Sequence, residues 1–157
     1  MGSASPKHVL ITVNIASEFG NRLRDTHCQV YSADLRIQAE KMDAYHYPDI
    51  AVVCGKPEYM DGRRDTVTNP LVIVEVLSSA TRSYDRGDKF ASYRRIATLR
   101  EYILIAQEAC HIEHFVRTEG GWDFTEIEDC QANLIVPTLS IAIPLTEIYA
   151  KVELLED

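Results

Sequence analysis

Two acidic residues on separate apolar runs are the side chains of this chain best placed to do chemistry. Asp49 opens the run of residues 50–53, and Glu75 lies inside the run of residues 71–77, both rich in Val and Ile. Such runs normally exclude charge, because an unpaired buried carboxylate costs several kcal/mol or shifts its pKa. We therefore interpret the two acids as ligands of a metal ion.

The elements that must position these acids are two neighbouring strands. Pro48 favours an extended conformation for the residue before it and places Asp49 at the opening of a strand, at the rim of the sheet. Directly opposed side chains on adjacent strands come within about 5 Å at Cβ, so both carboxylates can share one hard cation, Mg²⁺ or Mn²⁺. A metal-bound water could then attack a phosphorus, which predicts hydrolysis of a phosphodiester bond.

Length and composition predict a single domain over residues 1–157. The chain is 46% hydrophobic, enough for a substantial core, and it contains no long linker. The first residues are polar and small, unlike a secretory signal, and no apolar run is long enough to span a bilayer. We therefore expect a soluble, cytoplasmic protein without a membrane partner.

The cysteines and histidines give no clear metal motif. The four cysteines are scattered without a Cys-x-x-Cys pair, so we expect reduced thiols and no disulfides. His111 and His114 lie on a predicted strand, where residues three apart point to opposite faces, so we interpret them as ordinary surface or half-buried histidines.

Charge is unevenly distributed along the chain. The net charge is -8, yet residues 82–100 carry six basic and two acidic side chains. An acidic protein repels a phosphate backbone unless a basic patch and a bound cation supply local attraction. Arg82 and Arg86 in this segment are compatible with a phosphate-facing surface and equally with a solvated helix face.

Apolar periodicity predicts the elements of the first half of the chain. Helical spacing predicts a helix over residues 8–25, followed by extended segments over residues 28–39, 49–54 and 71–77. Residues 55–69 are polar and contain Pro and Gly, which predicts a loop.

The second half is predicted to contain a helix followed by mostly strands. Asp85 to Asp88 resembles a capping pattern before a helix with an apolar stripe at residues 90, 93, 96 and 97. A strand is expected over residues 101–105, a hairpin over residues 110–117 and 122–128, and a short helix through residues 149–152 capped by Thr146. The fold class is therefore α/β, or α+β, with a mixed sheet flanked by helices.

The ordered series of motifs resembles the Uma-two family of restriction-endonuclease-like proteins, within the PD-(D/E)XK nuclease superfamily. The resemblance is carried by Tyr-Pro-Asp at residues 47–49, Asn-Pro at 69–70, Glu-Val-Leu-Ser at 75–78, Asp-Arg-Gly-Asp-Lys at 85–89 and Glu-Tyr at 101–102. It implies a restriction-endonuclease-like fold and a nuclease with divalent-metal chemistry, for which DNA is the expected substrate.

The chain departs from the superfamily pattern at Leu77, where that pattern has a Lys two residues after the Glu. An aliphatic side chain cannot stabilise an oxyanion. The resemblance offers Lys89, on the following helix, as the catalytic replacement. The alternative is a surface Lys that pairs with Asp85 at i, i+4.

Other positions are weaker candidates. The resemblance also implies an extra N-terminal segment in family members, and we expect this chain to lack part of it. His8 matches a position that the family often fills with His, although a capping role fits equally. Ser78 could support the site or end its strand, and Gln38 is a further candidate on the strand leading toward Asp49.

Asp49 and Glu75 also have structural alternatives, and so does the function. Asp49 could be a turn residue satisfied by backbone N–H groups, and Glu75 a buried carboxylate paired with an arginine. The chain is then a metal-dependent nuclease, a catalytically inactive nucleic-acid-binding module on the same fold, or a homodimeric interaction module.

Overall fold

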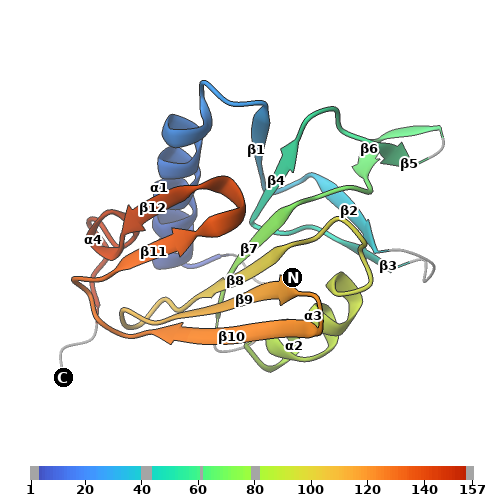
Figure 1. Ribbon diagram of the computed structural model, residues 1–157. Coiled ribbons are helices and arrows are strands. Elements are labelled where there is room, and N and C mark those ends of the chain that lie inside the picture. Colours follow the sequence, from blue (N-terminus) through green and yellow to red (C-terminus); the bar gives the residue numbers. More distant parts are fainter. Residues whose placement is uncertain (1–3, 40–43, 61, 79–81, 155–157) are drawn as a thin grey trace.

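A six-stranded mixed sheet forms the centre of the molecule, shown as a computed structural model in Figure 1. The structure describes residues 4–39, 44–60, 62–78 and 82–154. The strand order in the sheet is β1-β4-β7-β8-β9-β10. The bounds of these strands are β1 Cys28–Ser32, β4 Ile50–Cys54, β7 Val72–Val76, β8 Glu101–Ile105, β9 Ile112–Thr118 and β10 Gly121–Ile127.

The central pair β7 and β8 is parallel, and the other neighbours in this sheet are antiparallel. Parallel neighbours need a crossover connection, which here contains the short helices α2 (Arg82–Arg86) and α3 (Asp88–Tyr93). Every residue of β7 and β8 is buried, as expected for strands covered on both faces. The mixed sheet flanked by helices confirms the predicted fold class.

Helix α1 (Pro6–Leu23) covers one face of the sheet, and α2 and α3 lie on the other (Figure 1). The first face packs α1 against alternate residues of the central strands. It continues onto β11 (Asn133–Val136), the 3₁₀ turn η1 (Pro137–Leu139), β12 (Ile141–Pro144) and α4 (Leu145–Ile148). The predicted helix over residues 8–25 corresponds to α1, whose buried residues recur at helical spacing and are Ile11, Ile15, Phe19 and Leu23.

The second face has its own core, in which Phe90 and Tyr93 of α3 pack against Ile73, Leu77 and Leu104. Because side chains alternate along a strand, Val72, Val74 and Val76 belong to the first core, whereas Ile73 and Leu77 belong to the second. Glu75 therefore points to the face covered by α2 and α3.

Two predictions for the first half need correction. The extended segment 28–39 is two strands, because Asp34 has a positive φ of 80° and turns the chain from β1 into β2 (Arg36–Ala39). The predicted loop 55–69 contains β5 (Tyr59–Met60) and β6 (Arg63–Val67), which join β2 and β3 (Ala44–His46) in a second sheet of order β3-β2-β6-β5. Most of β6 is exposed, so its sequence lacks the apolar signal of a strand.

Two predicted helices also differ from the structure. The apolar stripe at 90–97 does not form one helix, since α3 ends at Tyr93. Thr146 does not cap a helix, because Pro144 is the N-cap residue of α4 and Thr146 lies inside that helix.

The expectation of reduced cysteines is wrong in the structure, where all four are paired. Cys28 and Cys54 are opposite each other in the register of β1 and β4, with Cα atoms 3.9 Å apart, and they form a disulfide. Cys110 and Cys130 lie before β9 and after β10 and form the second. The pairs are 26 and 20 residues apart in sequence, and only the strand arrangement brings them together.

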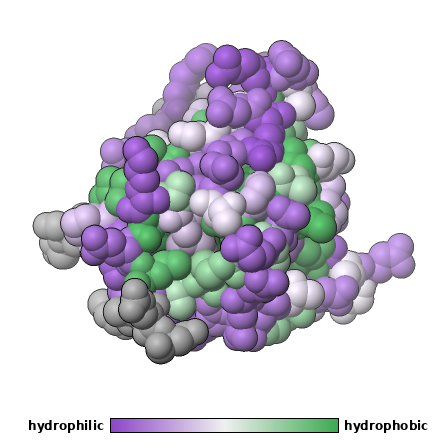
Figure 2. All heavy atoms as spheres, turned by 90° about the vertical axis from the view of Figure 1, so that its left-hand side faces the viewer, coloured by the Kyte–Doolittle hydropathy of each residue, from purple (hydrophilic) through white to green (hydrophobic). Residues whose placement is uncertain are grey.

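Figure 2 shows the face on which α4 and the β11–β12 hairpin lie, at the left of Figure 1. Hydrophobic side chains occur there in several areas separated by hydrophilic ones (Figure 2). Exposed apolar residues of the flanking elements include Val13 of α1, 55% exposed, and Ile135 of β11, 60% exposed. The homodimer named among the alternatives stays a prediction. No helix among the described residues has the length and apolar character needed to cross a membrane.

Candidate metal and catalytic site

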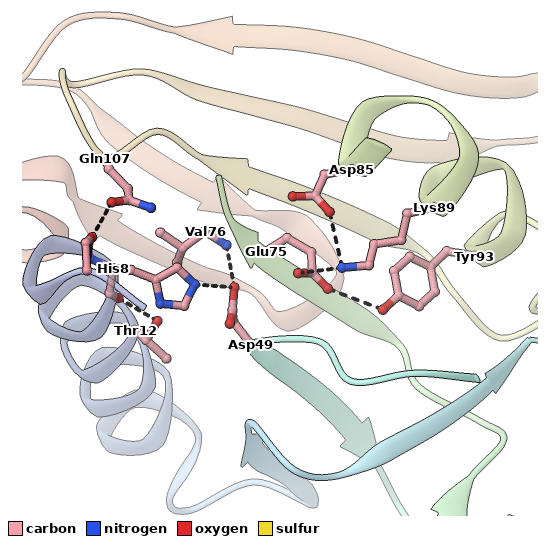
Figure 3. Close-up of polar contacts among 10 residues, drawn as sticks. His8, Thr12, Asp49, Glu75, Val76, Asp85, Lys89, Tyr93 and Gln107 are labelled. Atoms are coloured by element: carbon pink, nitrogen blue, oxygen red, sulfur yellow. Dashed lines mark hydrogen bonds and ion pairs between the residues drawn. The ribbon is translucent and has the colours of Figure 1, made fainter. Parts of the chain in front are cut away.

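The register of β4 and β7 brings the two acids together. Ile50 pairs with Val74, and continuing this antiparallel register by one residue places Asp49 opposite Glu75. Directly opposed residues of an antiparallel pair lie on the same face of the sheet. Figure 3 shows Asp49 where β4 begins and Glu75 on β7, and the charge of Asp49 acts on the Glu75 carboxylate.

Asp49 is held by one backbone group and one histidine. Its Oδ2 accepts a hydrogen bond of 2.7 Å from the N–H of Val76, and the same oxygen lies 3.2 Å from Nε2 of His8. The Asp49 and His8 side chains are 14% and 20% exposed. The backbone contact is the kind that a structural Asp would make, but it comes from the strand that carries Glu75, so it also fixes Asp49 beside that residue.

Glu75 is the most perturbed carboxylate of the site. Its side chain is 5% exposed; Oε2 accepts a hydrogen bond of 3.2 Å from Nζ of Lys89, and Oε1 accepts one of 3.3 Å from the Tyr93 hydroxyl. Burial raises the pKa of Glu75 to about 8, helped by the negative charges of Asp49 and Asp85 and opposed by Lys89. Glu75 is thus hydrogen-bonded to a lysine and a tyrosine. The alternative of an arginine partner is not observed among the described residues.

The start of α1 is anchored where His8 can reach Asp49. Ser5 is the N-cap residue, and its hydroxyl accepts a 3.1 Å hydrogen bond from the His8 N–H and donates a 2.6 Å bond to Oε1 of Gln107. The capping role therefore belongs to Ser5, three residues before the histidine. The hydrogen bond to Asp49 raises the pKa of His8 above its usual value, against the opposite effect of burial.

A break between two helices directs Lys89 toward the sheet. Gly87 is the N-cap residue of α3 and makes no side-chain cap, so the predicted capping role of Asp85 is wrong. Asp85 instead lies in α2, 2% exposed, with Oδ1 3.1 Å from Nζ of Lys89. Lys89 is 16% exposed, and its ammonium contacts both Asp85 and Glu75 (Figure 3). The alternative pairing with Asp85 at i, i+4 is present, but Lys89 is mostly buried and also contacts Glu75, so it is not a surface lysine.

The remaining candidates from the sequence are Ser78, Arg82, Arg86 and Gln38. Ser78 follows β7 and its carbonyl accepts a hydrogen bond from the N–H of Arg82, the exposed first residue of α2. Arg86 is not free for a phosphate, because it lies 2.6 Å from Glu113 of β9. Gln38 lies on β2 opposite Tyr45, and within the described residues its side chain makes no hydrogen bond with the site.

The structure adds three residues that the sequence did not assign to the site. Asp85 and Tyr93 both contact members of the cluster: Tyr93 lies one turn after Lys89 on the same side of α3, and Asp85 reaches the Lys89 ammonium from α2. Glu113 continues the cross-strand row that contains Glu75, since both are registered with Leu104 of β8. The four-residue spacing of Asp85 and Tyr93 from Lys89 in the sequence could have indicated that both lie near it. The position of Glu113 follows only from strand register.

The donor set fits a hard divalent cation. Asp49 and Glu75 offer carboxylate oxygens, the ligands that Mg²⁺ and Mn²⁺ prefer. Burial, with the smaller effect of the charges on Asp49 and Asp85, raises the pKa of Glu75, and a bound divalent cation would favour its charged form.

Comparison with known proteins gives consistent matches. The sequence model of the Uma2 family, described as "Putative restriction endonuclease", matches residues 1–146. Two relatives from Synechocystis sp. are described as "Uncharacterized protein sll1609" and "Uncharacterized protein slr1290". They are 32% and 33% identical over 81% and 77% of this chain. The matches cover 72% and 63% of those proteins, so the chain matches less than two thirds of the second.

A solved structure has the same fold. The crystal structure described as "a putative nuclease belonging to DUF820" from Anabaena variabilis superposes with a TM-score of 0.78 over 95% of this chain and 83% of that one. The sequence identity is 13%, so this likeness concerns the fold, which is restriction-endonuclease-like as predicted.

Proposed function

Because this chain belongs to the Uma2 family, we propose that it is a metal-dependent nuclease that hydrolyses phosphodiester bonds of DNA. Asp49 and Glu75 would hold Mg²⁺ or Mn²⁺, and Lys89 would act beside them as the catalytic cation. The observation that carries the proposal is the arrangement of Asp49, hydrogen-bonded to the N–H of Val76 on β7, beside Glu75 of the same strand, with a lysine ammonium 3.2 Å from Glu75.

Each residue of the cluster would have a separate role. A bound divalent ion supplies Lewis acidity, which makes a coordinated water more acidic and neutralises phosphate charge. The N–H of Val76 and the ring of His8 orient Asp49, and the Tyr93 hydroxyl orients Glu75. Lys89 places a positive charge where it can stabilise negative charge that develops on phosphate oxygens.

Lys89 supports the proposal in spite of Leu77. Leu77 is aliphatic and 2% exposed, and it packs in the core between the sheet and α3. The Lys89 ammonium reaches Glu75 from α3 instead, fourteen residues further along the chain. A different backbone position thus supplies the charge that the general superfamily pattern takes from the strand.

Basic side chains near the cluster could assist phosphate binding. Arg82 is exposed at the start of α2, whereas Arg86 would have to leave Glu113 to contact a phosphate. We therefore assign the larger expected contribution to Arg82. Its replacement by Ala should weaken DNA binding with little effect on metal binding.

The test compares wild type with Glu75→Gln, using Glu147→Gln on the exposed side of α4 as the control. Wild type and control should bind Mn²⁺ in titration calorimetry and cleave plasmid DNA in a reaction that EDTA stops. Glu75→Gln should do neither while keeping the circular dichroism spectrum of a folded protein. Undiminished cleavage by Glu75→Gln would reject the proposal, and DNA binding by wild type without metal binding or cleavage would instead indicate an inactive binding module.

A further inference from the structure

Lys89 lies between two buried carboxylates that belong to different elements. Its Nζ is 3.2 Å from Oε2 of Glu75 on β7 and 3.1 Å from Oδ1 of Asp85 on α2. The exposed fractions of the three side chains are 16%, 5% and 2%. One ammonium therefore faces two acids, and a third, Asp49, is opposite Glu75 across the strands.

The two contacts of Lys89 are nearly equal in length, 3.2 Å to Glu75 and 3.1 Å to Asp85. An ammonium has three donors on a flexible side chain, so it can serve both carboxylates. If the ammonium left Glu75, a small movement of this side chain would keep its contact with Asp85.

The backbone of Asp85 is tied to the sheet. Its carbonyl accepts a 2.9 Å hydrogen bond from the hydroxyl of Tyr102, a fully buried residue of β8. Gly87 lies between α2 and α3, so Asp85 and Lys89 approach Glu75 from separate helices. Asp85 therefore presents a buried carboxylate from an anchored backbone to a long, flexible lysine side chain.

We propose that the Lys89 ammonium occupies Oε2 of Glu75 in the metal-free protein, and that Asp85 is the positioning residue that holds the ammonium once Glu75 binds a divalent cation. This inference rests on the proposed function of the same site. A divalent ion at Glu75 repels an adjacent ammonium, and a mostly buried lysine has little access to water. Asp85 offers the displaced charge a second partner close to the site, where it remains available to the reaction.

The proposal makes Lys89 a competitor of the metal and Asp85 the group that reduces this competition. Lys89→Met should bind Mn²⁺ at least about tenfold more tightly than wild type, because the competing cation is removed. Asp85→Asn should bind it at least about tenfold more weakly, because the ammonium then has only Glu75 as its partner. In the double variant the loss caused by Asp85→Asn should be much smaller, since Asp85 acts through Lys89.

The experiment is titration of the four metal-free proteins with Mn²⁺ by calorimetry, with Lys56→Met as a control for removing one exposed positive charge. Unchanged or weaker binding by Lys89→Met would overturn the proposal even if Asp85→Asn did not fold. An equally large loss from Asp85→Asn with and without Lys89 would overturn it too, because Asp85 would then act on the metal directly. Absence of Mn²⁺ binding by wild type would reject the proposed function itself, whereas binding and cleavage by wild type with no coupling would reject only the roles of Lys89 and Asp85.

Discussion

Replacing Glu75 by Gln should make the free energy of unfolding of the metal-free protein less dependent on pH. The Glu75 side chain is 5% exposed, and burial together with neighbouring acids raises its pKa from 4.5 to about 8. Between these two pH values the folded protein retains a proton that the unfolded chain has lost. Proton binding by Glu75 therefore stabilises the folded state. This contribution to the free energy of unfolding is fully present below pH 4.5 and is lost as the pH rises through about 8.

The size of the effect follows from the linkage between proton binding and folding. One such group changes the free energy of unfolding by at most about 1.4 kcal/mol per pH unit. From pH 5 to pH 8 the wild-type protein should thus lose up to a few kcal/mol that Glu75→Gln keeps. The changed contact with Lys89 alters the stability of the variant as well, so the comparison concerns the slopes with pH and not the absolute values.

The assay is urea unfolding in EDTA at intervals of one pH unit between pH 5 and pH 8. The exposed variant Glu147→Gln should keep the wild-type slope. Equal slopes for wild type and Glu75→Gln would refute the reasoning, because they would show that Glu75 ionises alike in the folded and unfolded states.

Three further changes test the fold around the site. Replacing Cys28 and Cys54 by Ala should lower the free energy of unfolding by about 3 kcal/mol, because their disulfide closes a loop in the unfolded chain. Urea unfolding without reductant measures this loss. Reactive thiols in the untreated folded protein would contradict the pairing. Tyr102→Phe should cost about 1–2 kcal/mol by leaving the buried carbonyl of Asp85 unpaired, and an unchanged urea midpoint would argue against that hydrogen bond. Ile15→Ala should cost about 2–5 kcal/mol, since this fully buried residue packs α1 on the sheet; a loss below 1 kcal/mol, the scale of an exposed position, would contradict that packing.

Much of the sheet could be predicted because its central strands are uniformly apolar. The predicted segments 49–54, 71–77 and 101–105 correspond to β4, β7 and β8 within one residue at each end. The second sheet could not be found in this way. Its strand β6 is exposed over residues 63–65, and an exposed strand has no apolar alternation to detect.

The sequence by itself determined which acidic residues need a compensating partner. An acid within a run of Val and Ile needs a compensating partner whatever the fold, and this requirement singled out Asp49 and Glu75 before any geometry was available. The resemblance to the Uma-two family also indicated Lys89, through the motif at residues 85–89, but it did not indicate the break between α2 and α3 that directs this side chain.

Only the tertiary structure decided what these residues contact. Strand register places Asp49 opposite Glu75, and the capped start of α1 brings His8 from 41 residues away to within 3.2 Å of Asp49. Register also pairs Cys28 with Cys54, where sequence spacing predicted free thiols. Contacts between distant segments depend on how strands align and helices pack, and a local pattern of residue types carries no record of that alignment.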